Sequence, residues 1–160
     1  MAMFPEAPPP LLPILDAMGS LKKRELRKIE GARDKLMKRF PQFQWRVCMV
    51  GLPVETSLPL FGFWLLNACP LHELETAEQR TWTVLLLINA DHGNVAVTSG
   101  YAAEPCMSDD EWQAVLADMV KPWNAGNPAA AICRFFKSTQ RHLERNWKRF
   151  GSCSTSTHDS

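Results

Sequence analysis

The feature that most constrains the fold is an uninterrupted apolar run of strand length, Thr83 to Asn89, which reads TVLLLIN. A strand with one face in water alternates apolar and polar residues, whereas a strand covered on both faces does not need to. The run therefore predicts a central strand with helices on both of its faces. Such an arrangement is typical of an α/β domain.

Two further segments predict the rest of a small mixed sheet. Between Phe43 and Val50, apolar residues alternate with Gln44 and Arg46, the period of a strand with one better buried face. Val95 to Thr98 is short and β-branched, and the turn residues before it join it to the apolar run as a hairpin.

Helical segments surround these strands in the sequence. A basic helix follows the plausible N-cap Ser20, and a capping box, Ser108 with Glu111, begins an amphipathic helix that Pro122 and Gly126 are expected to end. A long C-terminal helix begins at Asn127-Pro128. An aromatic segment, Thr56 to Ala68, predicts one more helix despite Pro59 and Gly62.

The length of 160 residues fits one domain. Residues 1–18 are predicted to form a proline-rich arm, because five prolines fall between Met1 and Pro13. Residues 19–150 are predicted to form the single α/β domain, and the Ser/Thr-rich residues 151–160 a disordered tail.

No segment of the sequence approaches the roughly 20 consecutive apolar residues of a transmembrane helix. Met1 to Pro13 also lacks the basic start and continuous apolar stretch of a signal peptide. A cytoplasmic location is therefore expected for the sequence as it stands. An extracytoplasmic or membrane-associated location is the alternative if a leader or anchor has been removed.

Charge is distributed unevenly along the chain. Nine basic residues face three acidic ones between Lys22 and Arg39, and six face only Glu144 between Arg134 and Arg149. Between Glu55 and Lys121, ten carboxylates oppose only two basic residues. The pattern indicates an acidic central part flanked by two basic helices, which offer a surface for an anionic partner.

The segment VLLLINADHGNVAVTSGY, which ends in Gly100-Tyr101, resembles the TPM-domain family. The order of the features that follow is also similar to that family: first Glu104, then Asp109, then a helix closing at Pro122 with Gly126 beyond. The resemblance implies a small central mixed sheet flanked by helices. It also implies a calcium-binding or acid-phosphatase role for some members, while other members have no enzymatic role.

By this resemblance, Asp91, Glu104 and Asp109 are the candidate ligands of a Ca²⁺ or Mg²⁺ ion, since hard cations prefer carboxylate oxygens. Most members carry an acidic, glycine-containing segment directly before the apolar strand, where this chain has Thr81-Trp82-Thr83. A plainer interpretation remains open, in which Asp109 stabilises a helix N-terminus and Asp91 occupies an ordinary turn.

Three functions follow from these observations. The favoured one is a TPM-like accessory or binding domain with a partly degenerate acidic site and an unidentified protein partner. The first alternative is a phosphatase that uses a metal-activated water to hydrolyse phosphate esters. The second is a binder of anionic partners through the basic helices; nucleic acid is the less favoured partner, because Trp112 and Trp147 fall on core-facing stripes.

Overall fold

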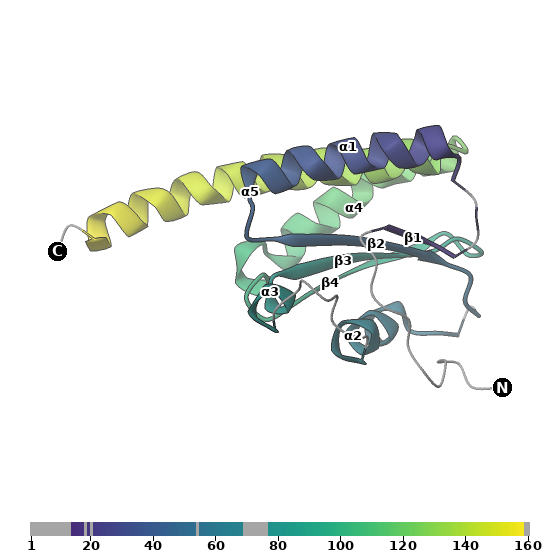
Figure 1. Ribbon diagram of the computed structural model, residues 1–160, viewed down its shortest axis with the longest axis horizontal. Coiled ribbons are helices and arrows are strands. Elements are labelled where there is room, and N and C mark those ends of the chain that lie inside the picture. The colour runs from purple at the N-terminus through teal and green to yellow at the C-terminus, as the bar shows by residue number, and fades with distance from the viewer. Residues whose placement is uncertain (1–13, 18, 20, 54, 69–76, 159–160) are drawn as a thin grey trace.

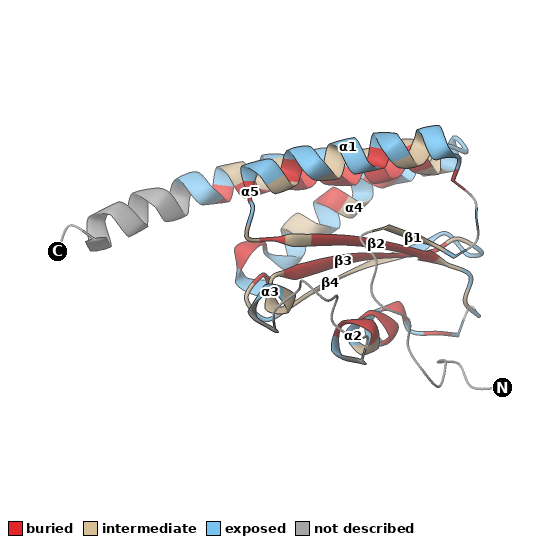
Figure 2. Ribbon diagram, viewed as in Figure 1, coloured by how far each residue is buried: buried red, intermediate tan, exposed pale blue. Residues whose placement is uncertain are grey.

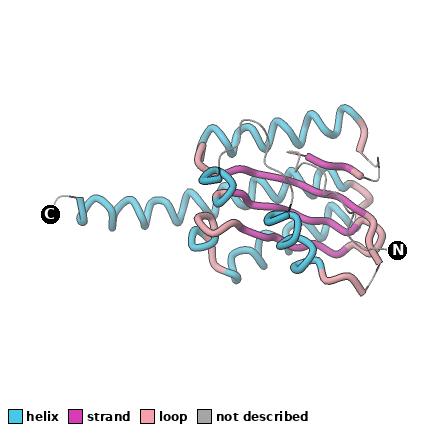
Figure 3. The backbone as a smooth tube through the Cα atoms, turned by 60° about the horizontal axis from the view of Figure 1, so that its bottom comes forward, coloured by secondary structure: helices cyan, strands magenta, loops and turns pink. Residues whose placement is uncertain are grey.

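A four-stranded sheet forms the middle of the computed structural model, which describes residues 14–17, 19, 21–53, 55–68 and 77–158 (Figure 1). The strands lie side by side in chain order: β1 (Ile14–Asp16), β2 (Gln44–Val50), β3 (Thr83–Asn89) and β4 (Asn94–Ser99). The first three strands are parallel, and β4 returns antiparallel to β3 (Figure 3). The prediction of a small mixed α/β sheet is confirmed.

All seven residues of β3 are buried, as the apolar run predicts. Successive side chains of a strand point to opposite faces, so β3 contributes to two separate cores. Val84, Leu86 and Ile88 pack into the larger core, and Leu85 and Leu87 into the smaller one. Buried positions accordingly face the sheet from the helical layers on both sides (Figure 2).

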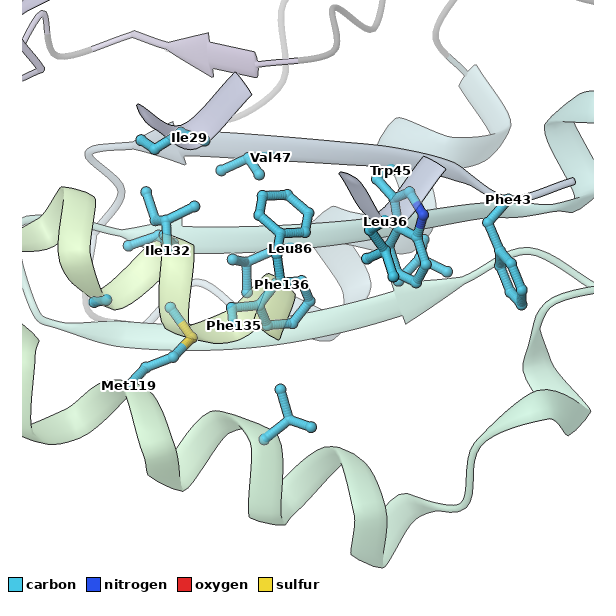
Figure 4. Packing of buried hydrophobic residues seen from close by; sticks show 14 of the residues in the cluster. Ile29, Leu36, Phe43, Trp45, Val47, Leu86, Met119, Ile132, Phe135 and Phe136 are labelled. Carbon is cyan, nitrogen blue, oxygen red and sulfur yellow. The ribbon is translucent and has the colours of Figure 1, made fainter. Parts of the chain in front are cut away.

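Three helices cover the larger core: α1 (Lys23–Arg39), α4 (Asp109–Asn124) and α5 (Pro128–His158) (Figure 1). Leu36 of α1 and Ile132 and Phe136 of α5 reach into this core with 1% or less of their surface exposed (Figure 4). The ring of Phe136 meets that of Trp45 edge to face, with ring centroids 6.4 Å apart. The amphipathic stripes of the sequence therefore mark the buried faces of these helices.

Helices α1 and α5 lie side by side on the outside of the domain and run in the same direction (Figure 1). Near the end of α1, Arg39 forms an ion pair with Glu144 of α5, at 3.3 Å. Further back, Arg33 Nε donates a hydrogen bond of 2.8 Å to the carbonyl oxygen of Trp45, which attaches α1 to β2.

The opposite face of the sheet is covered by α2 (Leu58–Ala68), with the short α3 (Ala77–Thr81) beside it (Figure 1). Phe61 and Leu65 of α2 are buried against Cys48, Leu85 and Leu87 of the sheet. The aromatic segment is thus helical, as predicted, and the molecule has three layers.

Pro122 lies inside α4 and does not end it, contrary to the sequence prediction. Proline removes one backbone N–H from the helix, and near the last turn this forfeits a single hydrogen bond. The helix ends instead at Asn124 with Ala125 as its C-cap, and Gly126 follows with φ of +78°, a conformation that favours glycine.

The structure differs from the sequence prediction at both ends of the described chain. Ile14–Asp16, assigned to the proline-rich arm, pairs in parallel with β2 as an edge strand. Helix α5 continues through residues 151–158, where composition predicts a disordered tail. A strand needs a partner that local sequence does not reveal, and a helix anchored in a core propagates cooperatively beyond it. Residues 1–13 of the arm and 159–160 of the tail lie outside the described residues.

After β4 the chain passes so close to the end of α3 that only glycine fits at position 100. A Cβ on Gly100 would overlap the carbonyl oxygen of Thr81 and lie 2.9 Å from that of Arg80. The approach is held by hydrogen bonds from Gly100 N–H to the Thr83 carbonyl and from Ala102 N–H to the Thr81 carbonyl, at 2.7 and 2.9 Å. The glycine of the Gly-Tyr pair noted in the sequence therefore has a steric cause.

We expect Gly100→Ala to lower the free energy of unfolding by about 1–3 kcal/mol, because the overlapping atoms belong to the backbone and cannot rotate away. The matched control is Gly31→Ala in the middle of α1, where no atom lies within 4 Å of the added Cβ. That change should raise stability by about 0.5–1 kcal/mol through helix propensity. Urea denaturation measures both; effects of the same sign would contradict the steric explanation.

Candidate functional site

The three predicted metal ligands lie at two opposite ends of the sheet. Asp91 is exposed in the turn between β3 and β4, which closes on Gly93 with φ of +69°. Glu104 begins the short 3-10 helix η1 (Glu104–Cys106) after the far end of β4, and Asp109 is the first residue of α4. The length of β4 separates Asp91 from Glu104 by roughly 20 Å, at about 3.4 Å per residue.

The course of α4 gives the same separation independently. Its last turn lies at the β3–β4 turn, where Trp123 Nε1 is 3.5 Å from the Cβ position of Gly93. Asp109, at its first residue, is therefore about 20 Å from that turn, at about 1.5 Å per residue. The structure brings Glu104 and Asp109 to one end of the sheet and leaves Asp91 at the other.

This arrangement does not fit the divalent metal that the family resemblance implies. Within the described part of the chain, no group of three or more His, Cys, Asp or Glu side chains is placed to hold a metal ion. A Ca²⁺ ion takes six to eight oxygen ligands, and carboxylates about 20 Å apart cannot share one.

The segment that replaces the family's acidic one has a structural role. The Thr81 carbonyl accepts hydrogen bonds from Ala102 and Ala103 N–H, at 2.9 and 3.3 Å. The ring of Trp82 packs edge to face on Phe43, with centroids 5.2 Å apart. Backbone acceptors and an aromatic side chain thus occupy the positions for which the resemblance implies acids.

A cleft of about 450 Å³, which we call the Tyr101 cleft, lies beside Glu104. Phe63 and Leu66 of α2 form one side and Ser99 to Tyr101 the other. Arg80 also lines it, but its Nε donates to the Leu66 carbonyl at the C-terminal end of α2. Glu104 itself is exposed at the cleft.

The acidic helix end contains a hydrogen-bonded cluster that sequence reasoning found only in part. Glu111 completes the predicted capping box: its Oε1 accepts from Ser108 N–H at 3.1 Å, while Glu111 N–H donates to Ser108 Oγ at 3.2 Å. The same carboxylate accepts from Asn146 Nδ2 and lies 3.3 Å from His142 Nδ1 of α5. The two α5 residues were missed, because only packing brings α4 and α5 together.

The pKa of Glu111 is lowered in this cluster. Burial opposes ionisation and would raise the pKa, but hydrogen bonds from Ser108, Asn146 and His142 to the carboxylate outweigh it. The cluster holds the start of α4 against α5. Because Ser108 bonds to Glu111 and not to His142, the arrangement does not provide an activated nucleophile.

A second hollow lies between α1 and the start of α5, and we call it the basic groove. Its volume is about 840 Å³. Its basic side chains come from both helices: Lys22, Arg24, Lys28, Lys35 and Lys137. Cys133 also lines it; burial raises the pKa of its thiol, and the nearby Lys137 and Lys28 lower it in part.

The basic side chains of this groove have no ion-pair partner among the described residues. Within the described part of the chain, no carboxylate lies within salt-bridge distance of the five basic side chains. The one acidic residue of the lining, Glu25, accepts a hydrogen bond from the backbone N–H of Lys22 at 3.0 Å. The sequence indicated the basic helices, but only the fold shows which of their residues share a groove.

A mixed sheet between two helical layers makes this protein a three-layer α/β domain. Residues 15–142, more than half of the chain, match the family described as the TPM domain. The protein therefore belongs to the TPM domain family. A comparison with curated protein sequences finds no match.

Two solved structures are similar to this fold. The BA42 protein from the psychrophilic bacterium Bizionia argentinensis matches with a TM-score of 0.60 and 14% identity, over 82% of this chain and 86% of that one. The N-terminal domain of the cg2496 protein from Corynebacterium glutamicum matches with a TM-score of 0.62 and 13% identity, over 88% and 84% of the two chains. At these identities the likeness concerns the fold alone.

No helix in the described ranges combines the length and the apolar character needed to cross a membrane. The 31-residue α5 has the length, but polar and charged side chains recur along it.

We expect Glu111→Gln to lower the free energy of unfolding by about 1–2 kcal/mol at pH 7, through weaker hydrogen bonds to a neutral acceptor. Because the pKa of Glu111 is lowered in the folded state, its carboxylate stabilises the protein at pH values above the ordinary glutamate pKa of 4.5. This contribution is lost as the pH falls through the folded-state pKa. The stability gap between wild type and variant should therefore narrow in acid. Urea denaturation between pH 7 and pH 3 measures it.

The control for this series is Asp110→Asn, which removes a charge from the same helical turn at an exposed side chain. It should change stability at neutral pH by no more than about 0.5 kcal/mol. A gap for Glu111→Gln that stays constant down to pH 3 would contradict a stabilising carboxylate.

Proposed function

We propose that this TPM domain is a binding module that holds an acidic segment of a partner protein in the basic groove between α1 and α5. The observation that carries the proposal is the set of five basic side chains around one hollow, to which no carboxylate of the described residues is paired. Like charges held close together repel one another and are relieved by an anionic ligand.

The shape of the groove supports an extended chain as the ligand. Small residues line its floor on both helices, namely Gly31 and Ala32 on α1 and Ala129 and Ala130 on α5. No atom lies within 4 Å of the Cβ position at Gly31, so the space beside that residue is open. A groove of this kind admits a backbone with carboxylate side chains that reach the lysines on either side.

The lining favours a protein segment over single-stranded nucleic acid. Nucleic-acid grooves combine basic side chains with aromatic ones on which bases stack. Among the described residues that line the basic groove, none is aromatic. The most exposed aromatic side chains, Phe63 and Tyr101, belong to the Tyr101 cleft beside α2, which covers the other face of the sheet (Figure 1).

A divalent-metal-dependent phosphatase is the competing proposal. It draws on the family resemblance and on Glu104, but the separation of Asp91 from Glu104 and Asp109 gives it no support. The two proposals make different predictions, since a phosphatase turns over a phosphate ester with Ca²⁺ or Mg²⁺ and loses that turnover on Glu104→Ala.

The test uses a fluorescein-labelled peptide of alternating glutamate and glycine, titrated with the full chain and followed by fluorescence anisotropy. We expect saturable binding that weakens by about tenfold in Lys28→Gln/Lys35→Gln, since these charges lie within a Debye length of the ligand. The control is Lys23→Gln/Lys38→Gln, which removes the same charge from exposed positions of α1 outside the lining. It should change the affinity by less than about threefold.

Equal losses in the two double variants would mean that net charge and not the groove binds the peptide, and would overturn the proposal. If a single-stranded oligonucleotide binds more tightly than the peptide, through the same two lysines, the ligand of the groove is nucleic acid and not an acidic protein segment. Metal-dependent hydrolysis of p-nitrophenyl phosphate that is lost in Glu104→Ala would favour the phosphatase.

A further inference from the structure

Strand β4 is an edge strand with an unused row of backbone hydrogen-bonding groups. Among the described strands it pairs only with β3, and it is the outermost strand on that side of the sheet (Figure 3). Gly100 N–H donates to the Thr83 carbonyl, so the antiparallel register makes Asn94, Ala96 and Thr98 the residues that bond to β3. The backbone groups of the alternate residues point away from the sheet.

These outward groups belong to Val95, Val97 and Ser99. Within the described part of the chain, no hydrogen bond uses them. Edge strands are usually protected from other chains by a charged side chain, a proline or a bulge. The sequence of β4, NVAVTS, has no charge or proline, and its pairing with β3 is continuous.

Most of the exposed large apolar side chains lie on the elements next to this edge. Of the five large apolar side chains that are exposed in the described residues, Leu60 and Phe63 lie on α2, Tyr101 follows β4, and Val120 lies on α4. Tyr101 is 86% exposed. Both helices pack on β4, one on each face of the sheet.

Two hollows lie against the ends of β4. The Tyr101 cleft includes Ser99 at one end of the strand, and a shallower hollow between Val95 and Val120 lies at the other. Side chains of a strand alternate between faces, so a strand added to β4 directs one set toward α4 and the other toward α2. Both sets meet apolar side chains.

We propose that β4 is a docking edge for an extended segment of a partner protein, which adds a fifth strand to the sheet and places an apolar side chain in the Tyr101 cleft. The charge at that end specifies the segment further. Glu104, Asp109 and Asp110 are exposed there, so the segment carries a lysine or arginine beside its apolar anchor. This surface is separate from the basic groove, and its ligand has the opposite charge.

A second copy of β4 does not fit the role. The side chains of β4 are small and already pack into its own domain, Val95 and Val97 against the larger core and Ala96 against the smaller. A paired copy would therefore bring no large side chain to the Tyr101 cleft. The hollow requires a side chain that this strand does not possess.

The test begins with a library of random nine-residue peptides selected on the full chain. We expect enriched sequences in which apolar residues alternate and a basic residue flanks them. The synthetic peptide should then slow amide hydrogen exchange at Val95, Val97 and Ser99. Exchange at Ala96 and Thr98 should change little, because these amides are already bonded to β3.

Two matched comparisons distinguish strand pairing from nonspecific hydrophobic binding. N-methylation of the alternate peptide amides that face β4 should weaken binding by at least about tenfold, while N-methylation of the intervening amides should not. In the protein, Val97→Pro removes an outward N–H that β3 does not use and should abolish binding. Val97→Ala keeps that N–H and should retain binding, and thermal unfolding checks that both variants fold.

The proposal is overturned if no such peptide is enriched, or if a bound peptide leaves exchange at Val97 unchanged. It is also overturned if the free chain dimerises and Val97→Pro makes it monomeric, since the edge would then serve a second copy. Failure of the acidic peptide to bind the basic groove leaves these measurements unaffected.

Discussion

The complete burial of β3 is the constraint on which the other layers depend. A strand whose seven residues are all removed from water requires cover on both faces and a partner on both edges. Helices α1, α4 and α5 cover one face, α2 covers the other, and β2 and β4 occupy the edges. The close approach of neighbouring elements then restricts the connecting segments, as at Gly100, where the backbone of α3 leaves no room for a side chain.

The layered arrangement also sorts the surfaces by charge and chemistry. The parallel packing of α1 and α5 concentrates basic side chains in one groove, because both helices turn their apolar stripes toward the sheet and their basic residues outward. The end of the sheet that carries the exposed Glu104, Asp109 and Asp110 lies beside exposed apolar residues and Arg80. One small domain thus presents two surfaces suited to ligands of opposite charge.

Membership of the TPM domain family fixes the fold more firmly than the activity. The matched residues 15–142 include almost the whole sheet and Gly100, which the close approach to α3 requires to be glycine. The carboxylates that would make a metal site are divided between two ends of the sheet. The Thr81 carbonyl accepts backbone hydrogen bonds, and the Trp82 ring packs on Phe43.

The sequence alone predicted the central strand, the hairpin, the helices and the capping box, because each depends on local periodicity or on neighbouring residues. It did not predict β1, whose three residues become a strand only by pairing with β2. Nor did it predict the cluster of Glu111 with His142 and Asn146, or the choice of lysines that share the basic groove. Those features join residues far apart in the chain, so only the tertiary structure decided which charges meet and which remain apart.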